Sequence, residues 1–329
     1  MNKWFTLSPS EKKDLIIGTA GMMGINPGII EKDIWVVAVL QEIFHSEKYI
    51  DQFIFKGGTS LSKVFNVIHR FSEDIDLIMN WELIGYSKEK DPWANRSKTQ
   101  QDKFNKNMHG LADEYLIKEF TPWLQKKLSA LDDRVVSVVP IGEGKIQIFY
   151  PTFFPAPYVR ETVLLEIGPL ASWVPSISQT IQTYVANLYP NVMHEEPTLI
   201  TVTTAERTFW EKVTIAHQIA YSNNVPPQRY SRHYYDIFML IKSGISENSL
   251  SNMNLLDSVA RFKERFYPSK KARYDLAKPG TIRLIPNTNI QHILKEDYTN
   301  MQVMFFKTPP TWEEIMSELK KLESLINMV

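Results

Sequence analysis

Apolar and polar residues follow two different periods along this chain, and the change between them predicts a mixture of strands and helices. A short apolar run at residues 53–55 is followed, one residue later, by the pair Gly57 and Gly58, which is typical of a strand that enters a tight turn. Thr59 or Ser60 can cap the helix that comes next. Its apolar residues recur at helical spacing and are Leu61, Val64, Phe65 and Ile68.

Two aspartates interrupt a second apolar run, at residues 74–79. Asp74 and Asp76 are two positions apart, so on a strand their side chains point to the same face. Carboxylates placed side by side repel each other and lose solvation unless a cation lies between them. Hard oxygen ligands in this small number suit Mg²⁺, which usually completes its octahedron with waters and substrate phosphates. The preceding glycine turn lets backbone amides approach a phosphate, whereas an Asp-x-Asp run alone is more typical of a solvated edge strand.

The order of strand, Gly-Gly turn, helix and Asp-x-Asp strand resembles the nucleotidyltransferase superfamily. More closely, FKGGTSLSKVF with RFSEDIDL is similar to the abortive-infection nucleotidyltransferase toxins of the AbiEii type. The resemblance implies an α+β fold, with a polymerase-beta-like nucleotidyltransferase core of a mixed sheet and flanking helices, and a helical C-terminal half.

The composition limits the chemistry and the cellular compartment that we expect for this protein, but it does not identify a substrate. The 329 residues include 37 Lys and Arg and 37 Asp and Glu, so only local clusters of charge can indicate a polyanionic partner. There is no cysteine, which excludes thiol nucleophiles and thiolate metal sites and agrees with a reducing cytosol. No apolar run approaches the roughly 20 residues of a membrane span. We therefore expect a soluble, cytoplasmic protein without membrane contact, in which any metal binds to oxygen or histidine.

The remaining elements predict a division into two domains. The expected helices cover residues 9–23, 27–44, 107–131 and 177–188, and the expected strands cover residues 135–139, 145–150, 161–167 and 198–203. The polar stretch 81–107 predicts a loop or insertion beside the site. We place the boundary near residue 200, with a nucleotidyltransferase core and N-terminal helices in 1–200 and a helical domain that completes the active site in 201–329.

Charged residues inside two of these elements have more than one interpretation. Glu31, Lys32 and Asp33 match a Glu-Lys-Asp run that stands upstream of the glycines in the AbiEii-type toxins, but we favour a solvated charged turn. Glu166 lies in an apolar strand, where a buried carboxylate is costly without a cation. In nucleotidyltransferases a third acid on a neighbouring strand completes the metal site or serves as the base, and we favour this role over a glutamate that faces water.

A second group of charged residues follows residue 200. Thr203 and Glu206 predict a capping box for a helix that carries Lys212 beside its apolar stripe, where lysines usually lie at the surface. The next predicted helix places three charged side chains on one face, namely Arg229, Arg232 and Asp236. A salt bridge between the last two is the structural alternative.

The AbiEii-type toxins carry a Glu-Arg-x-x-x-x-Lys helix followed by an Arg-rich helix with a single Asp, and both occur here in that order. The resemblance implies that Lys212 grips a triphosphate and that Asp236 orients or deprotonates an acceptor group or positions Lys212. The other expected substrate contacts are Gly57, Gly58, Thr59, Ser60, Arg229 and Arg232. Ser72 either bonds to a phosphate oxygen or caps the turn, and we favour the turn. A basic stretch with aromatic residues, 261–283, suits a phosphate backbone or a solvated face equally.

The expected reaction is transfer of a nucleoside monophosphate from an NTP to a hydroxyl, with Mg²⁺ held by Asp74, Asp76 and, as a third ligand, Glu166. The resemblance implies a toxin of a toxin–antitoxin system, with the 3′ end of tRNA as the preferred acceptor and a cognate antitoxin as a possible partner. Nucleotidylation of a protein target is an alternative reaction. A non-catalytic NTP-binding or RNA-binding module is a further alternative, but the presence of Lys212 and Asp236 beside the Asp-x-Asp pair favours an enzyme.

Overall fold

The computed structural model describes residues 3–86, 92–132, 134, 136–156, 159–169, 175–222 and 224–328. The chain forms two compact units. The first comprises Met1–Val64 and Phe71–Thr203, and the second comprises Phe65–Arg70 and Thr204–Val329. The second unit thus includes a short segment, Phe65–Arg70, that is distant in the sequence from the rest of that unit.

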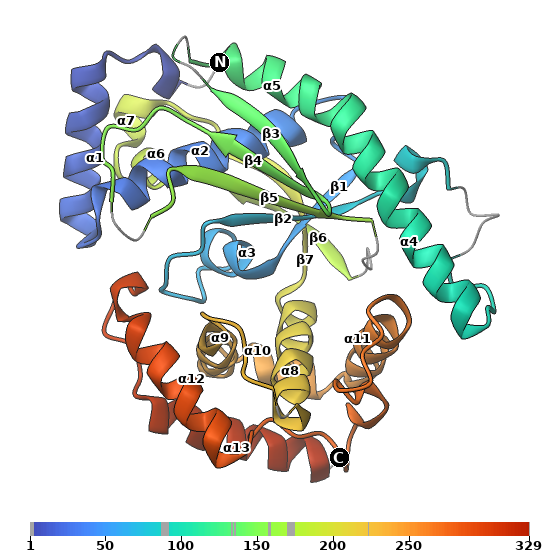
Figure 1. Cartoon of the computed structure of the whole chain (residues 1–329). Coiled ribbons are helices and arrows are strands. Elements are labelled where there is room, and N and C mark those ends of the chain that lie inside the picture. The colour runs from blue at the N-terminus through green and yellow to red at the C-terminus, as the bar shows by residue number, and fades with distance from the viewer. Residues whose placement is uncertain are drawn as a thin grey trace. The chain divides into compact units, whose positions relative to one another are not determined.

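A mixed sheet forms the centre of the first unit (Figure 1). Its seven strands are β1 (Phe53–Lys56), β2 (Asp74–Met79), β3 (Ser137–Gly142), β4 (Lys145–Phe149), β5 (Thr162–Gly168), β6 (Ser176–Ile181) and β7 (Thr198–Thr203). They are arranged in the order β3-β4-β5-β2-β1-β7-β6. β2 is antiparallel to β1 and parallel to β5, so the middle of the sheet joins strands that are distant in sequence.

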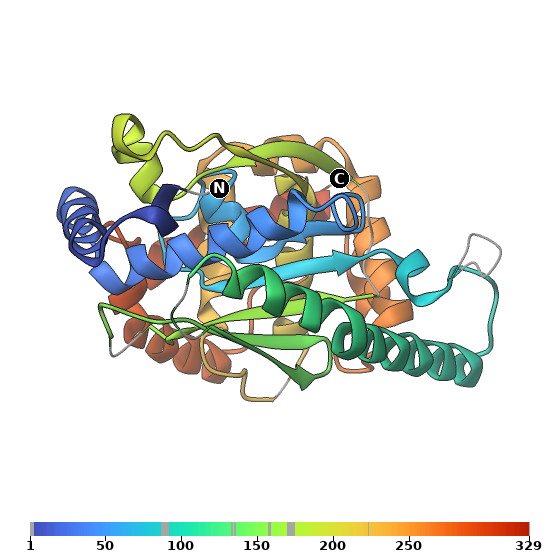
Figure 2. The ribbon, with the colours of Figure 1, turned by 90° about the horizontal axis from the view of Figure 1, so that it is seen from above.

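Helices flank this sheet, as the predicted fold class requires. They are η1 (Lys3–Thr6), α1 (Pro9–Met23), α2 (Pro27–Phe44), α3 (Gly57–Lys63), η2 (Trp81–Ile84), α4 (Lys98–Tyr115), the π-helical turn η4 (Leu116–Phe120), α5 (Thr121–Ser129), α6 (Tyr184–Leu188) and α7 (Pro190–Met193). α2 contacts β5 and β7 and runs across the sheet in Figure 2. α1 and α2 span the predicted residues, because a Ser8 capping box and the Asn26 side chain satisfy their first amides.

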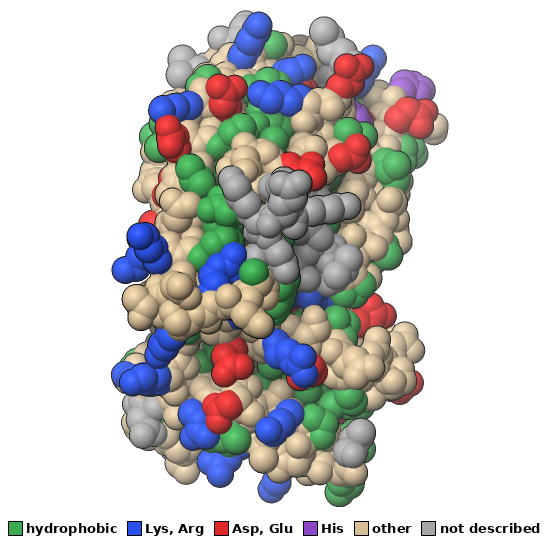
Figure 3. Space-filling view, turned by 90° about the vertical axis from the view of Figure 1, so that its right-hand side faces the viewer, with side chains coloured by type: hydrophobic (Ala, Val, Ile, Leu, Met, Phe, Trp, Pro, Cys, Tyr) green, Lys and Arg blue, Asp and Glu red, His purple; other side chains and the backbone are tan. Residues whose placement is uncertain are grey.

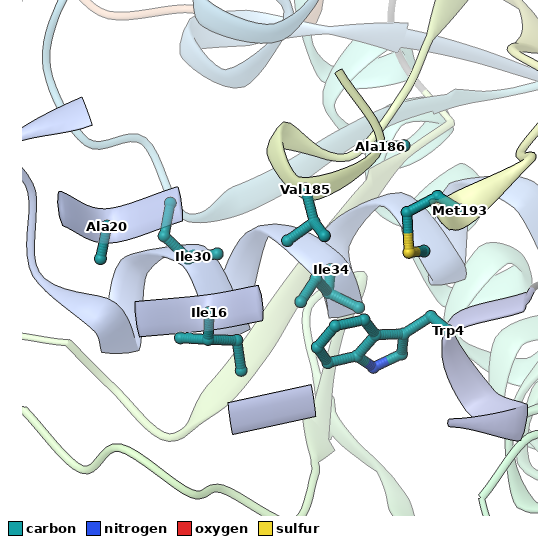
Figure 4. Close-up of a cluster of buried hydrophobic side chains, with 8 residues drawn as sticks. All are labelled: Trp4, Ile16, Ala20, Ile30, Ile34, Val185, Ala186 and Met193. Carbon is teal, nitrogen blue, oxygen red and sulfur yellow. The ribbon is translucent and has the colours of Figure 1, made fainter. Parts of the chain in front are cut away.

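A cluster of buried apolar side chains fixes α2 to the elements around it (Figure 4). Ile30 and Ile34 of α2 pack there with Ile16 of α1, and Val185 of α6 lies against the same group. The full cluster consists of Trp4, Ile16, Ala20, Ile30, Ile34, Val185, Ala186 and Met193. Close packing of this kind leaves little freedom for rotation of α2 about its axis, so the direction of its other side chains is set.

Three predicted elements of the first unit differ from the structure. The helix after the glycine turn ends at Lys63, because Asn66 adopts a left-handed conformation with φ of 51°. The polar stretch 81–107 already contains η2 and the start of α4, which is capped by Ser97; residues 87–91 lie outside the described part. Residues 176–181 form the edge strand β6, paired with β7, and only Tyr184–Leu188 of the predicted helix 177–188 is helical.

The second unit is helical, which confirms the fold class expected for the C-terminal half. Its elements are α8 (Ala205–Tyr221), α9 (Ser231–Lys242), α10 (Ile245–Leu250), α11 (Met253–Phe266), η5 (Tyr274–Leu276), α12 (Thr288–Asn300), η6 (Gln302–Met304) and α13 (Trp312–Met328). The cap of α8 is Thr204 and not Thr203, which ends β7. Within the described ranges, no helix combines the length and the apolar character that a bilayer crossing requires.

Candidate functional site

The two aspartates of β2 lie on the same face of the sheet. Asp74 and Asp76 are half-buried, whereas Ile75 and Leu77 between and after them are fully buried on the opposite face. The structure thus confirms the expected alternation, in which one face of β2 packs into the core and the other presents two carboxylates.

A row of charged residues crosses the sheet at Asp76. Asp76 pairs in register with Glu166 on β5 and with Lys56 on β1, and Glu166 pairs in turn with Lys145 on β4. Side chains in register on neighbouring strands share a face. Two acids therefore stand next to each other in this row, with a lysine on either side.

Glu166 is not buried in the apolar interior. Its carboxylate is 42% exposed and lies 3.7 Å from the Lys145 ammonium. Among the described residues, no group of three or more His, Asp or Glu side chains is gathered closely enough to hold a metal ion. Asp74 and Asp76 still fit Mg²⁺, since this ion is usually held by one or two carboxylates while phosphates and waters supply the remaining ligands.

The glycine turn packs directly against the Asp76 carboxylate. Gly57 has φ of 83°, and a Cβ atom built on it would lie 2.1 Å from Oδ2 of Asp76. A side chain is therefore excluded at this position both by the left-handed backbone and by the acid. The close approach explains why a glycine is needed between β1 and α3.

The hydroxyl groups near the turn have partners inside the protein. Thr59 donates to the carbonyl oxygen of Asp74 at 2.5 Å and lies 3.0 Å from the Ser72 hydroxyl, and Ser60 donates to the Gly57 carbonyl oxygen at 2.8 Å. Thr59 and Ser60 are also buried. These contacts favour the interpretation of Ser72 as a turn residue, and they show that the hydroxyls of Thr59 and Ser60 also support the turn.

Substitution of Gly57 by Ala is expected to displace the Asp76 carboxylate and so to lower kcat of a reaction that depends on this carboxylate by about tenfold to a hundredfold. Backbone strain at positive φ should also lower the free energy of unfolding by about 1–2 kcal/mol. Gly85→Ala is the matched control, since Gly85 has φ of 76° but no atom within 4 Å of the added Cβ. Steady-state kinetics of both variants checks this prediction, and equal losses of activity would contradict it.

The Glu-Lys-Asp run of α2 is buried and paired, so our interpretation of it as a solvated charged turn is wrong. Glu31, Lys32 and Asp33 are 3%, 1% and 6% exposed. The Glu31 carboxylate accepts hydrogen bonds from the amides of Phe153 and Phe154. Because consecutive helical residues point about 100° apart, the three side chains reach three different segments.

Asp236 and Lys212 form a buried ion pair in the second unit. Nζ of Lys212, on α8, lies 2.7 Å from Oδ2 of Asp236, on α9, and the Asp236 carboxylate is fully buried. Arg70 makes a bidentate contact with the same carboxylate, with Nε 2.7 Å from Oδ1 and Nη2 2.7 Å from Oδ2. Lys212 is therefore not the surface lysine that its helix position alone suggests.

The electrostatics of this cluster hold Asp236 in its ionised form. Burial raises the pKa of Asp236, but the Arg70 guanidinium and the Lys212 ammonium outweigh it and hold the pKa well below its usual range. Burial lowers the pKa of Lys212, and Asp236 partly offsets that effect. Both oxygens of Asp236 are engaged by cations, so the geometry favours a positioning role for this residue over proton transfer from an acceptor.

The predicted shared face of Arg229, Arg232 and Asp236 is wrong for Arg229, whereas Arg232 and Asp236 lie four residues apart on α9 and share a face. α9 begins at Ser231, and Arg229 precedes it with φ of 65°. The cause is Asp297 on α12, whose carboxylate accepts hydrogen bonds from the amides of Arg229 and Ser231. Arg232 is on α9, but the ion partners of Asp236 are Arg70 and Lys212.

The basic stretch 261–283 is partly neutralised by its own neighbours. Arg261 lies 2.9 Å from Asp257, and Arg273 lies 2.9 Å from Asp275. Lys263 donates to the carbonyl oxygen of Glu211 at 2.9 Å. Lys and Arg side chains are interspersed with Asp and Glu over the face shown in Figure 3, which agrees with the balanced composition of the chain.

The sequence profile described as "Nucleotidyl transferase AbiEii toxin, Type IV TA system" matches residues 38–318. This chain belongs to the AbiEii toxin family. Its structure is similar to MenT4, a nucleotidyltransferase toxin of Mycobacterium tuberculosis H37Rv, with 13% identity, a TM-score of 0.47 and coverage of 96% of this chain and 98% of that one. It is also similar to JHP933 of Helicobacter pylori, with 12% identity, a TM-score of 0.38 and coverage of 92% and 98%. No curated protein sequence matches significantly.

Arg70 is a member of the AbiEii chain's buried cluster that we did not predict. It is 2% exposed and belongs to the second unit, although Asp74, four residues later, belongs to the first. The segment that carries it is fixed there by a hydrogen bond from the His69 amide to the Tyr235 hydroxyl at 3.1 Å and by a bridge between Arg70 and Phe305. The signal in the sequence was an arginine at the start of the quoted RFSEDIDL run, between His69 and Phe71.

Proposed function

We propose that this AbiEii-family protein is a toxin that transfers a nucleoside monophosphate from an NTP to a hydroxyl group of an RNA acceptor. The observation that carries the proposal is the pair Asp74 and Asp76 on one face of β2, with Gly57 packed against Asp76. In the reaction the acceptor oxygen forms a bond to the α-phosphorus, the bond to the β-phosphate oxygen breaks, pyrophosphate leaves and the hydroxyl proton passes to solvent.

Asp74 and Asp76 are the residues that would hold Mg²⁺, with Glu166 beside Asp76 as a further oxygen ligand. The bound ion would neutralise phosphate charge and orient the triphosphate. The residues of this chain contribute positioning: β2 sets the spacing of the two carboxylates, and the backbone amides of Gly57 and Gly58 offer donors to phosphate oxygens.

Lys212 is proposed to bind the triphosphate. Nζ of Lys212 lies beside the Asp236 carboxylate, which Arg70 also contacts, and Arg232 is close enough to lower the pKa of Lys212. Cationic side chains gathered in a buried setting attract anionic ligands. Asp236 fixes the direction of the Lys212 ammonium, so the charge is pre-organised for the substrate.

The preferred acceptor is the 3′ end of tRNA. The basic and aromatic residues of 261–283 support an RNA partner, since Tyr267 is 44% exposed there and base stacking on aromatic rings is a common mode of single-strand binding. As a toxin of a toxin–antitoxin system, the protein is expected to act in the cytoplasm and to be countered by a cognate antitoxin.

Incubation of the purified protein with each labelled NTP, Mg²⁺, total tRNA and cell lysate tests the proposal. We expect label from one or more NTPs on tRNA, and its removal by nuclease digestion from the 3′ end. Label on a protein instead of RNA would replace the tRNA acceptor by a protein target. Absence of transfer to any macromolecule, with growth inhibition unchanged by Asp76→Asn, would contradict an enzymatic function.

A further inference from the structure

α2 presents a buried lysine to the residue that precedes the acidic strand. Nζ of Lys32 lies 2.5 Å from Oε2 of Glu73, and the two side chains are 1% and 6% exposed. The same ammonium donates to the carbonyl oxygen of Arg160 at 3.0 Å and lies 5.8 Å from the centre of the Phe71 ring. Lys32 thus connects three segments around the start of β2.

Stability alone is a weak explanation for this pair. Removing two charges from water costs several kcal/mol per ion, and apolar residues of similar volume often stabilise a core equally well. The position of the pair is more informative, because Glu73 is adjacent in the chain to Asp74.

We propose that Lys32 is a positioning residue for the metal-binding pair Asp74 and Asp76 and acts through Glu73. This inference rests on the proposed function. By holding Glu73 away from the acidic face of β2, Lys32 keeps a third carboxylate from competing for the cation. The Thr59 hydroxyl donates to the Asp74 carbonyl oxygen at 2.5 Å, so two buried contacts hold the start of β2. Partners that orient metal ligands in this way typically change metal affinity or activity by about 10–100-fold when removed.

The next residue of α2 provides a matched control. Asp33 lies 2.6 Å from Nζ of Lys63, and both side chains are 5% exposed. This second ion pair has the same chemistry and similar burial, but it joins α2 to the end of α3 and not to β2. Loss of either pair should lower the free energy of unfolding of the first unit by a similar amount. Only loss of the Lys32 pair should weaken the affinity for the metal ion.

The test compares four full-length variants: Lys32→Met, Lys32→Arg, Lys63→Met and the double variant Lys32→Met with Glu73→Gln. Mn²⁺ binding is followed by electron paramagnetic resonance in the presence of a non-hydrolysable NTP, and kcat and KM are measured at a range of Mg²⁺ concentrations.

For Lys32→Met we expect about tenfold weaker Mn²⁺ binding and a similar rise in the half-saturating Mg²⁺ concentration. Lys32→Arg and the double variant should recover at least half of the lost Mn²⁺ affinity. The double variant should do so because it no longer carries the Glu73 carboxylate that Lys32 neutralises. Lys63→Met should lower the thermal midpoint but leave Mn²⁺ affinity within about twofold of the wild type.

Equal Mn²⁺ affinities for Lys32→Met and the wild type, or an equal loss in Lys63→Met, would overturn the positioning role. If Lys32→Met does not fold, the double variant decides. If that folded protein binds Mn²⁺ more than about fivefold more weakly than the wild type, the loss of affinity does not come from a Glu73 carboxylate that lacks Lys32, and the proposal is overturned. If the wild type binds Mn²⁺ and NTP but transfers no nucleotide, the proposed function fails while the binding data still decide the role of Lys32. A wild type that binds no Mn²⁺ overturns both.

Discussion

Replacing Asp76 with Asn should lower kcat for nucleotidyl transfer by about a thousandfold, which corresponds to about 4 kcal/mol of lost transition-state stabilisation. Asn has nearly the shape of Asp, so the contact with Gly57 is kept, but the amide removes one of the two negative charges that would hold the proposed cation. The main loss should therefore appear in kcat and in the Mg²⁺ requirement, and the thermal midpoint should change by only a few degrees. Steady-state kinetics and a thermal melt of the same preparation check both statements.

Glu166→Gln is the control for this prediction, because Glu166 is in register with Asp76 but is 42% exposed and lies near Lys145. We expect its effect on kcat to be smaller than that of Asp76→Asn by about tenfold or more, since an exposed acid with a nearby cation contributes less to a metal site. An Asp76→Asn variant that keeps more than a tenth of the wild-type kcat would rule out Asp76 as a metal ligand.

The sequence predicted those features of the site that depend on residues close together in the chain. The bounds of α1 and α2 followed from caps and prolines, and the shared face of Asp74 and Asp76 followed from the two-residue period of a strand. The Gly57 turn was also predicted, although its contact with Asp76 required the register of β1 against β2. Local rules are sufficient for such features because the neighbours that decide them lie within a few residues.

The features that the sequence did not predict depend on partners far away in the chain. α9 starts later than expected because Asp297, more than sixty residues downstream, holds the amides before it. The burial of Glu31 depends on Phe153 and Phe154, which no periodicity of α2 can reveal. Arg70 is similar, since its partner Asp236 lies 166 residues later in the chain and no local pattern identifies it. Long-range contacts of this kind override local propensity.

Replacing Asp236 with Asn should produce the largest loss of stability among single substitutions in the second unit's charged cluster. It removes the carboxylate charge that both Arg70 and Lys212 contact, and the removal of one partner from a buried pair typically costs about 3–5 kcal/mol. Chemical denaturation measures this loss, and Glu318→Gln on α13 is the control, because its partners Lys242 and Lys321 are 50% and 66% exposed. That surface substitution should cost about 1 kcal/mol or less.

The pH dependence of this loss distinguishes the ion pairs from a packing effect. Since the pKa of Asp236 is lowered in the folded protein, its stabilisation is fully present above the unfolded-state pKa of about 4 and is lost as the pH falls through the folded-state pKa. The difference in free energy of unfolding between wild type and Asp236→Asn should therefore stay constant from pH 8 to about pH 5 and shrink at lower pH. A difference that is constant down to the acid limit of folding would mean that Asn disturbs packing and not charge. In that case the charge of Asp236 would not be what aligns Lys212 for its proposed contact with the triphosphate.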